Sequence, residues 1–238
     1  MAQLLRADLL PEAWIAPTAV RQLRALLRHR ASLVRLGTQQ RNRIHAVAAD
    51  HGYDRSASYW TGPGRGWLAE LDLPPASREI VTDCLAVIDG LAPLIERIDG
   101  ELHQHAKADP RTKVLRTLPG VGEFTALVIL AEIGDITRFP SARKLASWAG
   151  LTPTVRGSDL TVRHGHISKQ GSAWLRWAMN QAAQTAKRSP EFAATYSAIA
   201  KRRGKKIATI AIARKLLTRA YHLLADMEAI DPATPPRP

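Results

Sequence analysis

The sequence contains a single cysteine, Cys84, among its 238 residues. One cysteine cannot form a disulfide within the chain, and no cysteine pair offers the spacing of a zinc site. Such cysteine usage is typical of a reducing cytoplasm, where we expect this protein to act. The sequence also has no apolar run near the roughly 20 residues of a membrane-spanning helix, and no signal peptide follows Met1. We therefore expect no membrane partner.

Acidic residues are scarce relative to basic ones. Asp and Glu number 21 against 34 Lys and Arg, which gives a formal net charge of +13. An excess of this size predicts a polyanionic partner, with nucleic acid as the first candidate, although a basic surface without a partner is the alternative. The hydrophobic content of 45% is sufficient for one core or two small ones, so we expect a folded chain.

Two stretches space their apolar residues as helices do. The first covers residues 18–51, and the second covers residues 77–108 with steps of three and four, as in a coiled-coil seam. The seam residues are Val81, Cys84, Ile88, Leu91, Ile95, Ile98 and Leu102. We predict an antiparallel helical hairpin over residues 18–108, with a loop or short helices in the glycine- and proline-rich stretch 52–76. The seam suits packing within one chain and a homo-oligomer equally well.

The remaining residues predict a second domain between flanking segments. Residues 111–228 have the pattern of short packed helices, and residues 229–238 have the composition of a disordered tail. Residues 1–17 begin with apolar positions and no capping residue, so we interpret them as a remnant of an upstream domain or linker. The expected fold is mainly α: a long coiled-coil hairpin followed by a small domain with a helix-hairpin-helix motif and a short β-like loop.

The stretch LPGVG at residues 118–122 lies between a short helix and an apolar one, which is typical of a helix-hairpin-helix motif. Its glycines permit positive φ and a close approach of another backbone, so free N–H groups can face a phosphate oxygen. A plain tight turn between packed helices is the alternative. The predicted phosphate contacts are Pro119, Gly120, Val121 and Gly122, with the basic residues Arg111, Lys113 and Arg116 before them.

A polar, basic segment follows residues 150–153, and its Thr/Val alternation predicts a short hairpin or ordered loop. Ser158 lies in it, with Arg156, Arg163, His166 and Lys169 nearby in sequence. A serine that attacks a phosphodiester needs an accessible hydroxyl and cations that stabilise the phosphoryl charge. From the residues alone, a serine beside a glycine is more often a turn residue.

Ser168 is the second candidate nucleophile, although its place just before a helix suits capping or phosphate contact better. Residues 201–206 form a basic cluster of Lys201, Arg202, Arg203, Lys205 and Lys206. A solvated helix start and a phosphate-binding arm explain this cluster equally well.

Two His-x-His pairs, at residues 103–105 and 164–166, raise the question of a metal site. Residues two apart on a helix do not share a face, and no carboxylate or cysteine cluster completes a site around the second pair. We expect no metal ion bound by this chain.

Residues 115–176 resemble the C-terminal transposase domain of bacterial insertion-sequence transposases that pair a RuvC-like DEDD nuclease domain with a catalytic serine and are guided by a bridge RNA. The resemblance rests on the Gly-Leu-Thr-Pro motif at residues 150–153 and the serine after it. It implies that Ser158 is the nucleophile that becomes joined to DNA, although Asp159 stands where the family has glycine. It also implies DNA and a guide (bridge) RNA as partners, in the nucleoid of a bacterial cell.

The resemblance places the family's magnesium-binding acidic residues in an N-terminal domain, with the last of them immediately before the segment that matches residues 2–5. None of them has a counterpart in this chain, so we expect a truncated transposase. The function implied is DNA transposition of an insertion sequence by site-specific recombination. The rival hypothesis is a non-catalytic helix-hairpin-helix module that binds DNA or RNA.

Overall fold

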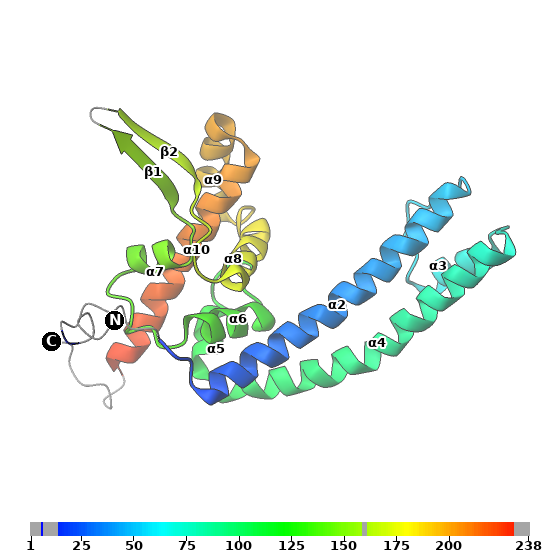
Figure 1. Ribbon diagram of the computed structural model, residues 1–238, viewed down its shortest axis with the longest axis horizontal. Coiled ribbons are helices and arrows are strands. Elements are labelled where there is room, and N and C mark those ends of the chain that lie inside the picture. The colour runs from blue at the N-terminus through cyan, green and yellow to red at the C-terminus, as the bar shows by residue number, and fades with distance from the viewer. Residues whose placement is uncertain (1–5, 7–13, 159–160, 231–238) are drawn as a thin grey trace. The chain divides into compact units, whose positions relative to one another are not determined.

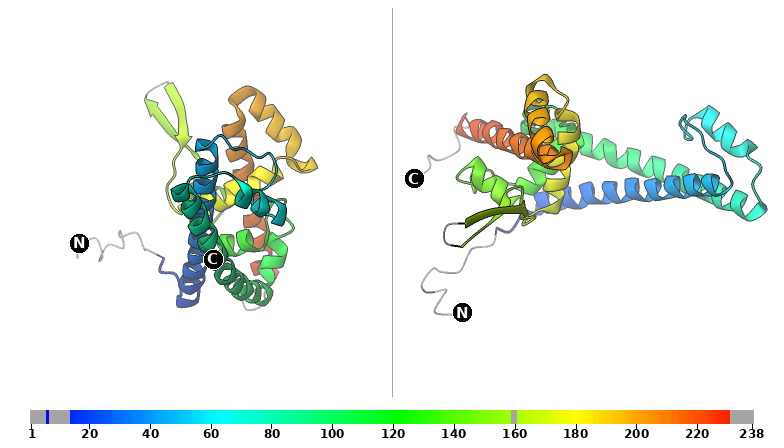
Figure 2. Two further views of the ribbon diagram at one scale, coloured as in Figure 1. Left: turned by 90° about the vertical axis from the view of Figure 1, so that its right-hand side faces the viewer. Right: turned by 90° about the horizontal axis from the view of Figure 1, so that it is seen from above.

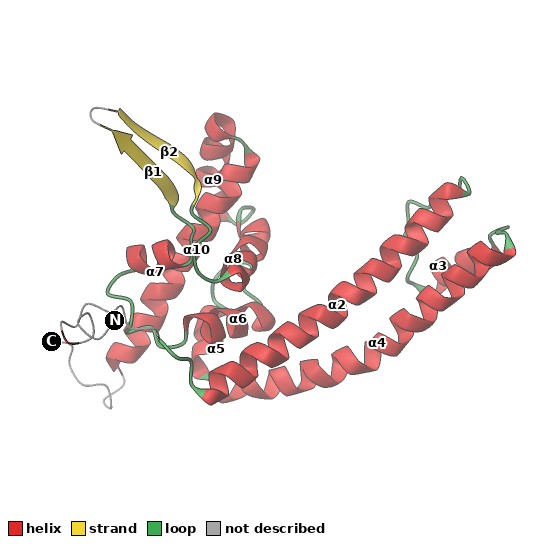
Figure 3. Cartoon of the chain, in the orientation of Figure 1, coloured by secondary structure: helices red, strands yellow, loops and turns green. Residues whose placement is uncertain are grey.

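The computed structural model describes residue 6 and residues 14–158 and 161–230. The chain divides into two compact units, Leu26–His105 and a second unit of Met1–Ala25 together with Ala106–Pro238. The described residues are mostly helical, with one two-stranded sheet, which confirms the prediction of a mainly α fold (Figure 3). Most of the predicted upstream remnant and of the C-terminal tail lies outside the described residues. The domain limits predicted at 18–108 and 111–228 stay predictions.

The unit Leu26–His105 is built on two long helices, α2 (Thr18–Asp50) and α4 (Pro75–Ala108), with the short α3 (Gly62–Glu70) between them (Figure 1). The two long helices run antiparallel. Arg30 near the start of α2 pairs with Asp99 near the end of α4 at 2.6 Å, and the Cys84 thiol donates to Gln40 Oε1 at 3.2 Å.

The apolar seam predicted on α4 is largely buried in this unit. Its members Val81, Cys84, Ile88, Leu91 and Ile98 are all buried. Burial raises the pKa of the Cys84 thiol. The apolar stripe therefore finds its main partner within the chain, since a helix with one apolar face must cover it.

Besides the start of α2, the described part of the other unit contains six helices: α5 (Pro110–Leu115), α6 (Glu123–Ile133), α7 (Ala142–Trp148), α8 (Ala173–Ala186), α9 (Pro190–Arg203) and α10 (Lys205–Ile230). Residues 126–133 of α6 are buried on every side, as expected of a core helix. The long α10 packs against α5, α7, α8 and α9 and so holds the unit together (Figure 1). No helix in the described part of the chain is long and apolar enough to cross a membrane.

Short polar residues start several of these helices. Ser141 accepts from the backbone N–H of Lys144, and Ser172, the N-cap of α8, accepts from that of Leu175 at 3.1 Å. The Ser172 hydroxyl also donates to Oε2 of the buried Glu132 at 2.8 Å. This bond ties the start of α8 to the core helix α6.

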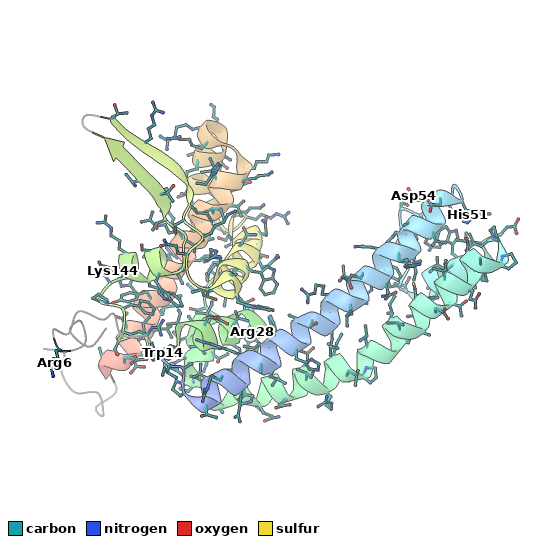
Figure 4. All side chains as sticks on the ribbon, viewed as in Figure 1. Arg6, Trp14, Arg28, His51, Asp54 and Lys144 are labelled. Carbon is teal, nitrogen blue, oxygen red and sulfur yellow. The ribbon has the colours of Figure 1, made fainter. Side chains whose placement is uncertain are left out.

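Trp14 anchors the segment before α2 to this unit (Figure 4). Its indole lies against the backbone of Gly134, and the Arg138 guanidinium stacks on it with 4.2 Å to the ring centroid. Burial, followed by the positive charge of Arg24, lowers the pKa of Arg138. Arg24 donates in turn to the carbonyl oxygen of Ala131 at 2.8 Å, so two guanidinium groups hold the indole.

Candidate nucleic-acid interface

The polar segment after residue 152 forms a β-hairpin, which was one of the two predicted forms. Strand β1 (Pro153–Ser158) pairs antiparallel with β2 (Thr161–Ile167), and the ladder is irregular between Pro153 and Val155. The hairpin projects from the helices of its unit in each view (Figures 1 and 2). A two-stranded ribbon of this kind can reach a ligand that lies beyond the helical body.

Ser158 is the last residue of β1 and pairs with Thr161, so it lies at the far end of the hairpin. The neighbouring Asp159 falls outside the described residues. Arg156 and Arg163 are register partners two positions from this end.

The cations that surround Ser158 in sequence are divided between the two ends of the hairpin. Arg156 and Arg163 are near Ser158, whereas Lys169 follows Ile167, whose register partner is Pro153. Pro153 and Ser158 are five residues apart on β1, which corresponds to about 16 Å along a strand. Lys169 therefore belongs to the root of the hairpin and not to the surroundings of the serine.

A network of backbone contacts closes the hairpin root. The Arg176 guanidinium donates from Nη1 to the carbonyl oxygens of Ala149 at 3.2 Å, Gln170 at 2.5 Å and Gly171 at 3.2 Å. The N–H of Ser168 donates to the carbonyl of Thr152 at 2.9 Å. These bonds fix the direction in which the hairpin leaves the helical body.

Two glycines make this close approach possible. Gly150 has φ +69° and Gly171 has φ +65°, both in the left-handed region. A Cβ at Gly150 would overlap the backbone of Gln170, and a Cβ at Gly171 would overlap the Trp148 carbonyl oxygen. Only glycine fits at either position.

Ser168, the second candidate nucleophile, is part of this root. Its Oγ is enclosed by protein and has no hydrogen-bond partner among the described residues. An enclosed hydroxyl cannot reach a phosphodiester without a rearrangement. The next residue, Lys169, is exposed and has φ +56°, an unfavourable conformation for a residue with a side chain.

A groove of about 1010 Å³ lies where the hairpin root meets α9 and α10. We call it the hairpin–α10 groove. Its cationic rim is made of six side chains: Lys169, Arg202, Arg203, Lys206, Arg214 and Lys215. His166 lines the groove as well. Nitrogen-tipped side chains project around the hairpin and α9 in Figure 4.

The basic cluster at residues 201–206 is divided by this groove. Arg202, Arg203 and Lys206 line it, whereas Lys201 and Lys205 do not. Gly204, with φ +86°, ends α9 and lets α10 begin immediately after it. One charge run therefore contributes some of its members to the groove and directs others elsewhere.

The groove lining also has an apolar part, which we call the isoleucine floor. It includes Ile167, Ile199, Ile207 and Ile210. Ile207 is 55% exposed, so its side chain is accessible to a ligand in the groove.

The sequence analysis did not identify Arg214 and Lys215 as binding residues. They follow Ile207 and Ile210 at helical spacing, so they share the groove face of α10. The opposite face buries residues such as Ala208, Ile212 and Leu216. The repeat of isoleucine followed by a cation on one face was the available signal, but it resembled an ordinary core pattern.

The predicted phosphate-binding turn joins α5 and α6, and its two glycines differ. Gly120 has φ +76°, and a Cβ there would overlap the Ala182 carbonyl oxygen on α8. Gly122 has φ −85° and open space around it. Packing on α8 thus explains the glycine at position 120, while Gly122 is exposed at the start of α6. The predicted phosphate contact stays a prediction.

The cations before this turn have carboxylate partners. Arg111 pairs with Asp109 at 2.7 Å, and the hydrogen bonds that Arg111 donates to that carboxylate raise the pKa of Arg111. Arg116 lies 3.7 Å from Glu123, which occupies the first turn of α6. Lys113 is exposed. The positive charge near the turn is therefore partly neutralised, unlike that of the groove.

Within residues 14–158 and 161–230, no group of three or more His, Cys, Asp or Glu side chains could hold a metal ion. The family resemblance places the magnesium-binding acidic residues in an N-terminal domain, outside these residues.

Residues 112–197 match the family described as Transposase IS116/IS110/IS902. The chain is 33% identical over 131 residues to the 43.6 kDa protein of insertion element IS110 from Streptomyces coelicolor, covering 54% of this chain and 32% of the relative. It is 27% identical over 229 residues to the transposase for insertion sequence element IS1111A of Coxiella burnetii, covering 87% and 59%. It is 32% identical over 145 residues to the pilin gene-inverting protein of Moraxella bovis, covering 58% and 45%.

The chain thus spans between about a third and three fifths of the length of these relatives. The matched region of the family includes α6, α7, the β-hairpin and α8, and it ends within α9. Ser158 and the glycines of the hairpin root all lie inside it. Residues 112–197 are therefore similar to the transposase domain of the IS116/IS110/IS902 family.

Proposed function

We propose that this chain acts in the transposition of an insertion sequence, by site-specific recombination of DNA with Ser158 as nucleophile. The observation that carries the proposal is the hairpin inside the matched transposase domain: it holds Ser158 at its far end and joins a cation-lined groove at its root. Two of the relatives are a transposase and a pilin gene-inverting protein, and both names agree with this chemistry.

The proposed step is a transfer of a phosphoryl group from DNA to serine. The Ser158 oxygen forms a bond to the phosphorus, and the bond between phosphorus and a sugar oxygen breaks. The proton of the serine hydroxyl ends on the leaving sugar oxygen. Arg156 and Arg163, register partners near the serine, would stabilise the charge on the phosphoryl oxygens.

Ser158 is favoured over Ser168 by position. Ser158 is at the free end of a projecting hairpin, whereas the Ser168 oxygen is enclosed at the root. Ser168 also donates its backbone N–H to Thr152, so its exposure would disturb the root. A catalytic role for Ser168 would need that network to open.

We expect the Ser158→Ala variant to lose the covalent DNA adduct by a factor on the order of a hundred or more, because no other hydroxyl replaces the nucleophile. The assay uses the chain fused to the acidic nuclease domain of a full-length relative, with a guide RNA and a suicide DNA substrate. A phosphoserine ester survives denaturation, whereas electrostatic binding dissolves in salt and detergent.

Ser168→Ala is the matched control and should retain the adduct. Loss of the adduct in Ser168→Ala with retention in Ser158→Ala would overturn the assignment. If neither change affects the products and no adduct forms, the second candidate function, a non-catalytic nucleic-acid-binding module, is favoured. The six groove cations are the observation behind that second candidate.

Two further partners belong to the proposal. A guide RNA would supply sequence recognition, because backbone contacts carry no base information. Magnesium would be held by acidic residues outside those that the structure describes, and this chain would supply the serine and the cationic surface.

Self-association through the helical hairpin is also proposed, but through different residues from the predicted seam. Val87 and Leu94 are seven residues apart on α4 and are 45% and 44% exposed. Leu36 on α2 is 42% exposed as well. These side chains are available to a second copy, whereas Leu91 is buried within the chain.

The double variant Val87→Lys and Leu94→Lys is expected to convert a dimer into a monomer without unfolding it, because it places charge on an exposed apolar stripe. Light scattering measures the mass and circular dichroism monitors the helices. Leu91→Lys should instead reduce helicity, since it buries a charge. A wild-type chain that is monomeric at high concentration would show that the dimer hypothesis is wrong.

A further inference from the structure

We propose that the hairpin–α10 groove binds an unpaired stretch of nucleic acid, with phosphates on the cationic rim and at least one base on the isoleucine floor. The proposal rests on the proposed function for the kind of partner, but not on the identity of the nucleophile. It concerns a surface formed largely by α9 and α10, much of which lies beyond the matched residues 112–197.

The groove has an uncompensated positive charge. No carboxylate lines the groove, and in the described part of the chain none of the six rim cations forms an ion pair. Other arginines of the same unit do have such partners: Arg111 pairs with Asp109, and Arg219 pairs with Glu191. Closely spaced like charges repel one another unless a polyanion lies between them. The groove is therefore electrostatically complementary to a nucleic-acid strand.

The isoleucine floor favours an unpaired strand over a duplex. A duplex presents charged phosphates and sugars to a groove of this kind and keeps its base faces stacked inside. An unpaired strand exposes the faces of its bases, which pack on apolar or planar side chains. Ile207 stays 55% exposed in the unbound chain, and Ile210 and Ile199 lie beside it in the groove lining. These aliphatic surfaces explain an apolar floor that a phosphate track alone would not need.

The volume of the groove and its distance from Ser158 also fit a bound strand. About 1010 Å³ lies at the upper end of the roughly 300–1,000 Å³ of small-ligand pockets, which leaves room for nucleotide-sized groups. The root of the hairpin is about 16 Å along β1 from Ser158. At about 3.4 Å per nucleotide in one strand, the bound bases would lie about five nucleotides from the phosphate at the serine. The groove would hold a separated strand close to the recombination point.

The test measures binding of the full 238-residue chain to a 12-nucleotide single strand and to a blunt duplex of the same length, by fluorescence anisotropy at several salt concentrations. The floor variant is Ile207→Asn, whose exposed position tolerates a polar side chain. The rim variant is Lys206→Gln with Lys215→Gln. The control is Lys201→Gln with Lys205→Gln, which removes two charges from the same basic cluster but does not alter the groove lining.

We expect the floor variant to bind the single strand roughly tenfold more weakly, with an unchanged salt slope and little change for the duplex, since base contacts are apolar. The rim variant should also lose roughly tenfold or more, and its salt slope should fall by about 1.4, the value for two phosphate contacts to a single strand. The control pair should change affinity less than about threefold.

Three results would overturn the proposal. If the floor variant loses single-strand and duplex binding equally, or loses neither, the isoleucine floor does not contact a base. If the control pair weakens binding as much as the rim pair does, non-specific electrostatic attraction explains the binding and a defined groove does not. Displacement of the strand by an acidic polypeptide more effectively than by an oligonucleotide would point to a protein partner.

The nucleophile is tested separately in the same assay. Ser158→Ala should bind the single strand with wild-type affinity, since Ser158 is remote from the groove. If no covalent adduct forms at Ser158 while the groove still binds the strand, only the assignment of Ser158 as nucleophile is rejected. If the adduct forms but the floor and rim variants bind the single strand as the wild type does, only the groove proposal is rejected.

Discussion

The Gly171→Ala variant is expected to lose at least about 3 kcal/mol of stability in the unit that contains α5 to α10. Gly171 has φ +65°, and an added Cβ would overlap the carbonyl oxygen of Trp148. That neighbour is backbone at the end of α7 and cannot move aside as a flexible side chain could. Urea denaturation followed by tryptophan fluorescence measures the loss.

Gly122→Ala is the matched control in the same unit. Gly122 has φ −85° and no atom within 4 Å of an added Cβ, so alanine there should cost only about 0.5–1 kcal/mol as an N-cap change. Equal denaturation midpoints for the two variants would show that residues 148 and 171 do not approach as closely as the structure has them. The hairpin root would then be loose.

The Arg176→Met variant is expected to lose the covalent adduct almost completely while the helical unit stays folded. One guanidinium nitrogen of Arg176 donates to three carbonyl oxygens, of Ala149, Gln170 and Gly171. Hydrogen bonds from a charged donor contribute about 1.5–3 kcal/mol in favourable cases, and Arg176 is half-buried, so we expect a net destabilisation of about 2–3 kcal/mol. The larger effect falls on the direction of the hairpin that carries Ser158.

Limited proteolysis separates these effects, because a released root should be cut between residues 149 and 171 before the helices are. Arg176→Lys should rescue only part of the activity, since one ammonium group cannot reproduce the planar geometry of the guanidinium. Full adduct formation by Arg176→Met with an unchanged protease pattern would mean that the root does not position the serine. Loss of all helicity would mean that the residue is a general core contact.

Local signals accounted for most of the helices. The long periodic stretches at 18–51 and 77–108 were identified from apolar spacing and became α2 and α4 with ends within two residues of those expected. The Ser172 cap is a local feature of the same kind, because a capping serine acts on N–H groups only three residues away. Such features depend on neighbours in sequence, which a single chain displays directly.

The candidate site was predicted less completely. The hairpin and its serine followed from the Thr/Val alternation and the family resemblance, but the cations grouped around Ser158 proved to be divided between the far end and the root. Arg111 and Arg116 were assigned to phosphate, yet each has a carboxylate close by. Proximity in sequence does not show which charges are already paired in the fold.

The sequence by itself determined a basic, mainly helical chain with a transposase-like segment and a serine between arginines, because composition, periodicity and motif are local properties. Only the tertiary structure decided which face of α10 is core and which is groove, since Ile207 and Ile212 differ in exposure but not in chemistry. It likewise decided that Arg214 and Lys215 join Lys169 around one groove. Contacts between residues distant in sequence depend on packing, which periodicity does not reveal.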